Sequence, residues 1–420
     1  MSKEKKYINV IVICILFFTI LFLRYIRALY QEFYPIALFL LFLSAYNLNF
    51  KIRKNNKLSL IIGMVFLMFL LLSIGNDGFG KNMINNLLLN LLPISLPCYF
   101  ASVAKGFSKK ELFSLSRRIL LVLNAYFVLN VPIIITQYIT GSFMMKRFLS
   151  WGLFAFDQMT GFMGGFGTGI LNVYWIVLIS INILYSWLTK KKSYMIWSLI
   201  IMIVMFILSN MNEIKSFLPS AIIIIFITYF LRFFSSSNFL KIAGRIFILF
   251  VFFSFISFFL YQRSELVKNL IDIILESLMD YSLNTMPTTH NERAYLTWLV
   301  FNHYNGFKFG VGLNSFDLIT QVIHKNIAIN SFVLPIFQGG IFYFLSIWQI
   351  YVCQMYSSIK NSKMKVNIRV VLYIILSVFV YFIALFTQPF RDFYVMFFIG
   401  IWLFYACLFV NRDEDLELEM

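Results

Sequence analysis

The chain has 420 residues, of which 60% are hydrophobic and only 13% are charged. Soluble domains average about 25% charged residues, so this composition excludes an ordinary soluble protein, which needs more polar surface to stay in water. The formal net charge of +17 would suit a nucleic-acid binder. However, the positions of the charges account for it by membrane topology, and no nucleic-acid partner is expected.

Apolar runs long enough to cross the ~30 Å hydrocarbon core of a bilayer recur along the whole chain. Basic residues, rather than a small-residue cleavage site, follow the first run, which predicts a membrane span and not a signal peptide. We therefore predict an all-α fold, a polytopic integral membrane helical bundle of about 12 transmembrane helices in a single membrane domain, 1–420. The predicted spans are 8–23, 33–50, 58–74, 83–104, 119–140, 169–189, 194–210, 217–234, 246–262, 330–356, 370–388 and 392–410.

The basic residues predict the orientation of these spans. About two thirds of the 35 lysine and arginine residues lie at the termini and in every second connection. Basic connections stay in the cytoplasm, so the protein is predicted to be multi-pass with both termini cytoplasmic. The clusters on this side are Lys3, Lys5 and Lys6; Lys51, Arg53, Lys54 and Lys57; Lys105, Lys109, Lys110, Arg117 and Arg118; Lys190, Lys191 and Lys192; Arg232, Lys241 and Arg245; Lys360, Lys363, Lys365 and Arg369; and Arg412.

The four cysteines, Cys14, Cys98, Cys353 and Cys407, all lie inside apolar runs. Their spacing matches no metal site. We therefore expect no bound metal, and buried free thiols that pack as small apolar side chains.

The outer connection 141–168 is rich in aromatic residues and glycine. It is too apolar for a free loop and too interrupted for a span, so it predicts a re-entrant or interfacial element that is buried against protein. Lys146 and Arg147 stand near its start.

A large extracytoplasmic loop, 263–329, separates the ninth and tenth spans and holds all three histidines of the chain. Its first part, 264–280, alternates at helical period and predicts an amphipathic helix. That helix would lie either on the membrane surface or as a cover packed on the bundle. Thr289 and Glu292 then have the spacing of a capping box that opens a helix over 293–304.

Arg293 falls in the first turn of that helix, beside free backbone N–H groups, where it would form a concentrated anion site. A guanidinium also binds phosphate with two parallel hydrogen bonds. The alternative is an arginine paired with Glu292, Glu276 or Asp280.

Polar residues also mark other outer positions. Asn330 opens the tenth span, and Gly339 and Gly340 follow at a depth where they would allow close helix packing or a kink. Three outer clusters would form a polar, cationic bowl if they surrounded one cavity; otherwise they are interfacial anchors and local ion pairs. These clusters are Lys146 and Arg147, Glu213 and Lys215, and Arg391 and Asp392.

The order of residues from 293 to 343 resembles the O-antigen polymerase (Wzy) and O-antigen ligase superfamily of bacterial glycan assembly. An arginine leads a short helix with a tryptophan, a Gly-x-Gly turn follows, and Asn330 stands at the mouth of a span. Asn330, Gly340 and Tyr343 fall on the ligase pattern, but the histidine of that pattern is replaced by Ile329. Isoleucine can neither accept a proton nor bind phosphate, which favours a polymerase over a ligase.

The resemblance implies a multi-pass protein of the bacterial cytoplasmic membrane that polymerises O-antigen or capsule repeat units. Its substrates would be undecaprenyl-diphosphate-linked oligosaccharides on the outer leaflet, so the glycosyltransferase would need no nucleotide sugar, metal or other cofactor. Its partners would be the lipid bilayer and, in addition, a chain-length regulator and a flippase. The alternatives are a ligase-type glycan transferase and a lipid-linked oligosaccharide flippase or transporter, although the repeat symmetry of many transporters is not visible.

This chemistry needs positive charge on the departing diphosphate and a base for the acceptor hydroxyl. Arg293 is the first candidate for the charge, with Lys308 or Arg391 assisting. His290, His303 and His324 are the candidate bases because histidine titrates near neutral pH, with Glu213 and Asp392 next. The expected substrate-binding residues are Lys308, Asn330, Arg391, Asp392, Glu213, Lys215 and Arg147.

Overall fold

The computed structural model describes mainly helices at the two ends of the chain and in its first half. The described residues are 2–26, 33–49, 95–104, 106–146, 159–165, 167–212, 333–341 and 392–410, with the single positions 214, 217, 221, 262, 268, 295, 298, 302, 344 and 345. Within these residues every regular element is helical and none is a strand, which confirms the all-α prediction.

Four of the described helical segments are long and apolar enough to cross a membrane, namely Lys3–Leu23, Lys110–Thr140, Thr168–Ser186 and Lys192–Met211. The structure therefore supports a membrane protein. Shorter apolar helices cover Pro35–Asn47, Ser95–Ala104 and Phe393–Trp402. The predicted spans 58–74 and 370–388 lie outside the described residues, and only Phe217, Ala221 and Gln262 are described within 217–234 and 246–262, so the total of about twelve stays a prediction.

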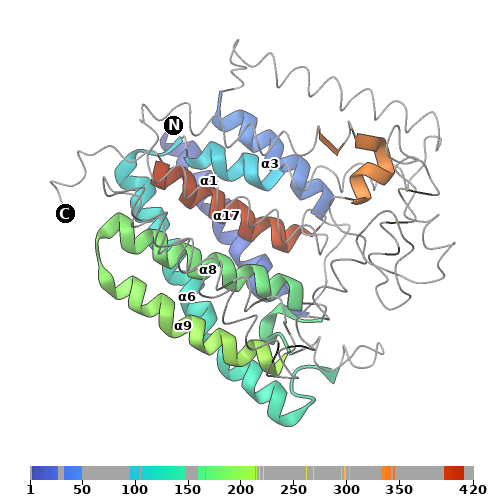
Figure 1. Ribbon diagram of the computed structural model, residues 1–420. Coiled ribbons are helices and arrows are strands. Elements are labelled where there is room, and N and C mark those ends of the chain that lie inside the picture. Colours follow the sequence, from blue (N-terminus) through green and yellow to red (C-terminus); the bar gives the residue numbers. More distant parts are fainter. Residues whose placement is uncertain are drawn as a thin grey trace.

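The elements follow the predicted spans in chain order (Figure 1). The first span runs through α1, a π-helical turn η1 and α2 without a break, and the 3₁₀ turn η3 lies in the connection before α8. The elements and their bounds are α1 (Lys3–Phe18), η1 (Thr19–Leu23), α2 (Arg24–Ile26), α3 (Phe33–Asn47), α6 (Lys109–Thr140), η3 (Gly161–Met163), α8 (Thr168–Thr189), α9 (Lys192–Met211) and α17 (Phe393–Val410).

Helix α6 begins ten residues before the predicted span 119–140. Ser108 is its N-cap, and Glu111 completes a capping box with the Ser108 side chain and backbone. Such reciprocal hydrogen bonds satisfy the free N–H groups of a first turn. The prediction of a connection over 105–118 was therefore wrong, since Arg117 and Arg118 lie inside the helix.

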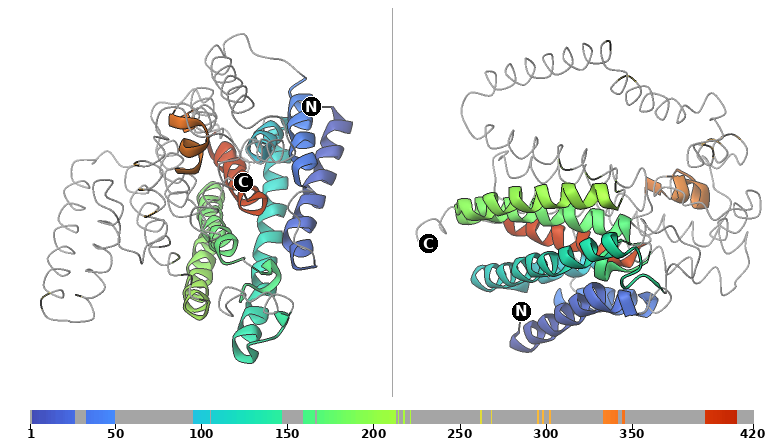
Figure 2. Two further views of the ribbon diagram at one scale, coloured as in Figure 1. Left: turned by 90° about the vertical axis from the view of Figure 1, so that its right-hand side faces the viewer. Right: turned by 90° about the horizontal axis from the view of Figure 1, so that it is seen from below.

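Helix α8 is the centre of the described bundle. It packs against α9 and α17, and the three run side by side in Figures 1 and 2. In its apolar window 89% of the residues are buried, against 33% for the first span, 39% for α6 and 28% for α9. The outer faces of α1, α6 and α9 thus remain available to lipid, whereas α8 contacts protein on all sides.

Paired amides tie these helices together inside the bundle. Asn124 of α6 and Asn182 of α8 exchange hydrogen bonds of 3.2 and 3.0 Å, and the Trp197 indole of α9 donates to Asn124 at 2.7 Å. Asn9 of α1 and Asn47 of α3 exchange a similar pair of 2.9 and 3.0 Å. Because a lone amide is costly in hydrocarbon, such pairs favour one arrangement of the helices.

Three predicted cytoplasmic clusters lie at the same end of the bundle, which we call the basic end. Lys6 of α1 forms an ion pair of 2.7 Å with Glu111 of α6. The Phe113 ring of α6 stacks on Tyr185 of α8, which also contacts Tyr194 of α9. These contacts bring together the starts of α1 and α6 and the turn between α8 and α9, as the charge pattern predicts for one side of a membrane.

One prediction about the cysteines is wrong. Cys14 is exposed on α1, and Cys98 is half-buried. The reason is that α1 has a lipid-facing side, where an apolar position need not be covered by protein. The side chains of Cys353 and Cys407 lie outside the described residues.

Candidate functional site

A buried arginine organises the end of the bundle opposite the basic end, which we call the Arg24 end. Arg24 is only 4% exposed. Its Nη1 donates to the carbonyl of Met163 and lies 3.4 Å from that of Gly164, and its guanidinium lies 4.9 Å from the centre of the Tyr394 ring. Its Nε is buried without a hydrogen-bond partner in the described part of the chain. A buried guanidinium with a spare donor can bind an anion.

The carbonyls that face Arg24 belong to a turn over 159–164, which α6 holds in place. Asn130 donates to the Thr160 carbonyl at 3.2 Å and accepts from the Phe162 N–H at 2.8 Å. Gln137, one to two turns further along α6, accepts from the Gly161 N–H at 2.9 Å. Both amides are buried, so each replaces hydrogen bonds that the turn would otherwise make with water.

Only glycine fits the centre of this turn. The φ of Gly161 is +62°, and a Cβ there would lie 1.9 Å from Oδ1 of Asn130. Residues 159–165 of the connection 141–168 therefore form a compact turn buried against protein, as the aromatic and glycine-rich composition predicts, whereas 141–146 are largely exposed.

Asp392 caps the helix that faces Arg24. Its Oδ1 accepts hydrogen bonds from the N–H groups of Tyr394 at 2.8 Å and Val395 at 3.2 Å, as an N-cap does. The positive charge of Arg24 acts on this carboxyl. Its Oδ2 accepts no hydrogen bond from the described residues. A carboxylate oxygen that these residues leave without a donor is a candidate proton acceptor.

Aromatic rings pack around this polar centre. Phe22 of η1 contacts Tyr126 of α6 at 5.7 Å and Phe162 of the turn at 5.6 Å between ring centroids. Tyr25 also contacts Phe162, at 6.5 Å. The hydroxyl of Tyr126 is buried without a hydrogen-bond partner among the described residues. The centre therefore combines a low-dielectric surround with a spare N–H and a spare O–H group, which strengthens any hydrogen bond made there.

An open depression of about 490 Å³ lies beside Tyr25. It lies where α6 ends at Gly141, whose φ is +65°. Lys146 lines it, as do Thr140 and Phe143. The depression thus offers an aromatic and a cationic side chain next to the turn that Arg24 holds.

Of the predicted site residues, the structure describes Asp392, which it places near Arg24. The other predicted residues lie outside the described part of the chain: His290, Arg293, His303, Lys308, His324, Ile329, Asn330, Arg391, Glu213, Lys215 and Arg147. Their predicted roles stay predictions.

Single described residues bear on the predicted local structure around them. Tyr295, Trp298 and Asn302 are helical, and the Asn302 amide donates to the Trp298 carbonyl at 3.1 Å, which agrees with the helix predicted over 293–304. Lys268 is helical and exposed within 264–280. Gly340 has a φ of +76°, a left-handed conformation that favours the kink over simple close packing.

Arg24 was not among the predicted site residues. It counted only as one of the basic residues after the first apolar run, although an arginine predicted at the outer side of a membrane needs a partner. Asn130 and Gln137 were a second signal, because buried amides in an apolar run also need partners.

In comparisons with known proteins, no family model matches the chain, and no curated protein matches it.

Proposed function

We propose that this chain is a membrane-embedded glycosyltransferase that polymerises oligosaccharide repeat units carried on a polyprenyl diphosphate. The observation that carries the proposal is the Arg24 end, where a buried guanidinium with a spare N–H lies near the Asp392 carboxyl. Transfer of a glycan from a diphosphate to a hydroxyl needs a cation at the leaving group and a base at the acceptor. Both groups are present at this end.

Chain connectivity supports the polar, cationic bowl. In the chain, each of Arg391, Arg147 and Glu213 is next to a described residue. Those described neighbours are Asp392 before α17, Lys146 beyond the end of α6, and Asn212 at the end of α9. Because α6 and α9 both begin at the basic end, their last residues lie toward the other end of the bundle.

Within the bowl, Arg293 is the proposed main ligand of the departing diphosphate, and Lys308 or Arg391 assists it. Arg24 adds charge from inside the bundle without leaving its carbonyl partners. Asp392 gains weight as the base relative to the histidines, because its carboxyl lies near Arg24 and its Oδ2 accepts no hydrogen bond from the described residues. His290, His303 and His324 stay the alternative bases.

Ile329 favours the polymerase over a ligase-type transferase, because the ligase pattern needs a histidine there. A flippase would also have a cationic cavity, but it would not need a base beside that cavity. The proposal therefore predicts chain growth rather than translocation or a single transfer to another lipid.

The test is extension of a lipid-linked repeat unit by the purified full chain in proteoliposomes. Wild type should build long chains, and Arg293→Ala should lower the rate by about 10²- to 10³-fold, as expected when one charge-stabilising donor is removed. Lys268→Ala, a change at an exposed residue of the same loop, is the matched control and should extend normally.

Undiminished chain length in Arg293→Ala would remove Arg293 from the mechanism. Translocation of the lipid-linked unit without chain growth would support the flippase instead. Transfer of one glycan to a different lipid acceptor, without elongation, would support the ligase-type transferase.

A further inference from the structure

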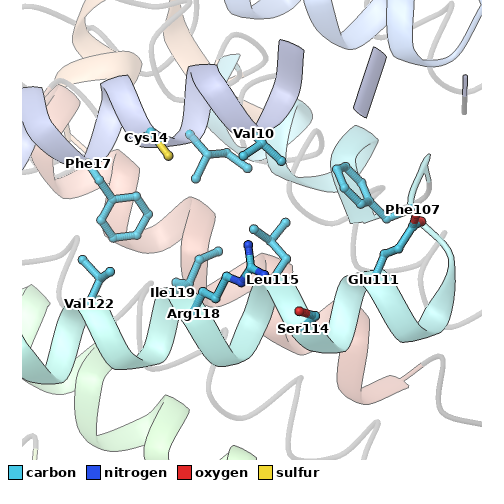
Figure 3. A pocket seen from close by; sticks show the side chains of 11 residues that line it. Val10, Cys14, Phe17, Phe107, Glu111, Ser114, Leu115, Arg118, Ile119 and Val122 are labelled. Atoms are coloured by element: carbon cyan, nitrogen blue, oxygen red, sulfur yellow. The ribbon is translucent and has the colours of Figure 1, made fainter. Parts of the chain in front are cut away.

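A groove lies between the first span and α6, at the basic end of the bundle (Figure 3). Its volume is about 520 Å³, more than three times the ~150 Å³ that an apolar cavity needs to bind benzene. The two helices are joined on either side of it, by the Lys6–Glu111 ion pair at one end and by the Phe22–Tyr126 ring contact at the other. The apolar walls are Val10, Ile13 and Phe17 on α1, and Leu115, Ile119 and Val122 on α6.

This groove faces the space that hydrocarbon would fill. Both helices belong to candidate membrane spans, and next to the groove they expose large apolar side chains, with Ile15 58% and Leu121 65% exposed. An apolar groove at that level does not hold water. Lipid acyl chains are the apolar groups available there, so an acyl chain is the occupant that its walls fit.

One wall of the groove carries an uncompensated positive charge. Arg118 lines the groove and is exposed, and it makes no hydrogen bond or ion pair with any residue that the structure describes. Glu111, the only acid among the described lining residues, is already bound by Lys6 at 2.7 and 2.8 Å and by Ser108. Glu111 therefore cannot neutralise Arg118.

Position along the helix indicates what would neutralise Arg118. It lies seven residues beyond Glu111, about 10 Å further along α6, and Ser114 lies one turn before it on the same face. A cation at the edge of hydrocarbon is costly without an anion. The charge-assisted hydrogen bonds that a guanidinium makes to phosphate would offset this cost.

We propose that the groove binds an anionic phospholipid from the leaflet at the basic end, with one acyl chain between α1 and α6 and its phosphate on Arg118. The many lysines of this end favour an anionic over a zwitterionic headgroup, because a basic membrane-proximal surface attracts anionic lipid. The bound lipid would fill the space between the two helices. This inference does not depend on the proposed glycosyltransferase activity.

Cys14 provides a reporter already present in the chain. It lines the groove, its thiol is exposed, and in Figure 3 its sulfur points into the space between the two helices. An acyl chain in the groove should shield this thiol from a lipid-soluble maleimide, and peptide mass spectrometry can quantify alkylation of Cys14 apart from the other cysteines.

The experiment is native mass spectrometry of the purified full chain, titrated with phosphatidylglycerol or with phosphatidylcholine. We expect wild type to bind phosphatidylglycerol about tenfold more tightly, because in phosphatidylcholine the choline cation competes with Arg118 for the phosphate that both lipids carry. Arg118→Gln should lose that preference. Arg117→Gln, which changes the adjacent arginine that does not line the groove, should keep it.

A second variant tests the acyl-chain part of the groove. Cys14→Trp should fill the groove and weaken binding of both lipids, while the helix content by circular dichroism stays that of wild type. In wild type, added phosphatidylglycerol should slow Cys14 alkylation several-fold. An equal preference in Arg118→Gln and wild type, an equal loss in Arg117→Gln and Arg118→Gln, or Cys14 alkylation that ignores lipid would each overturn the proposal.

Discussion

The two ends of the described bundle use charged residues in opposite ways. At the basic end, Lys6 and Glu111 pair while both remain partly in contact with solvent. At the Arg24 end, the guanidinium is buried among backbone carbonyls and the Tyr394 ring. Exposed charges of the first kind orient a membrane protein and add little stability, whereas a buried charge holds its surroundings in one arrangement and is costly to disturb.

The contrast between the two ends indicates where to look for chemistry in a chain with so many basic residues. The number and clustering of its lysines identify the basic end. The burial of Arg24 and its hydrogen-bond partners identify the Arg24 end. The single buried arginine there is more informative about a site than the larger number of exposed lysines at the other end. Substitutions at each end can test whether the contrast holds.

The largest effect is expected from Arg24→Met. The substitution removes the donor to the Met163 and Gly164 carbonyls and leaves them buried, which should lower the free energy of unfolding by about 3 kcal/mol. Thermal unfolding in detergent measures the shift. Lys191→Met, at an exposed residue of the basic end, is the control and should unfold like wild type. Equal unfolding midpoints for both variants would remove the contrast between the ends.

Gly161→Ala should have the next largest effect, about 1–3 kcal/mol of destabilisation, because its φ of +62° and the close Asn130 side chain both exclude a Cβ. Gly169→Ala is the matched control, since a Cβ there would meet nothing within 4 Å. Unfolding midpoints of the two variants give the comparison. A midpoint for Gly161→Ala as high as that for Gly169→Ala would show that the turn can rearrange away from Asn130.

Two substitutions of Asp392 should distinguish its role as a helix cap from a role as the base. Asp392→Ala should cost about 1 kcal/mol through loss of the helix cap, whereas Asp392→Asn should keep the cap and most of the stability. If Asp392 is the base, both variants should lose chain extension in the lipid-linked assay. Normal extension by Asp392→Asn would leave Asp392 as a cap alone and return the role of the base to the histidines.

The smallest effect is expected at the basic end. Lys6→Gln removes an exposed ion pair with Glu111, and such pairs are screened by water and salt. The variant should unfold close to wild type, and any difference should vanish at high salt. A shift as large as that of Arg24→Met would mean that the basic end is also a cooperative, buried structure.

Most helix bounds in the described part of the chain were predictable from hydropathy. The predicted spans 169–189, 194–210 and 392–410 match α8, α9 and α17 within a few residues at each end. The start of α6 was missed, although Ser108 and Glu111 have the spacing of a capping box. Hydropathy averaging ends a span where lysines and arginines begin, but a helix continues as long as its backbone hydrogen bonds are satisfied.

The candidate site was less predictable. Asp392 was expected to bind substrate, and the structure adds that it caps α17 and lies near Arg24. Arg24 was not expected at all, because its role depends on a turn that lies far along the chain. Local pattern cannot indicate which buried carbonyls an arginine will meet.

The amino-acid sequence by itself determined which described segments are helices apolar enough to cross a membrane, where glycine allows a tight turn, and which described helix ends carry basic clusters. Each of these depends on neighbours within about twenty residues, through hydrophobicity, backbone conformation and charge. Only the tertiary structure decided that Arg24 would donate to the carbonyl of Met163, 139 positions later. It alone placed the helix cap Asp392 close enough for that charge to act on its carboxyl, because such contacts arise from helix packing and not from local sequence.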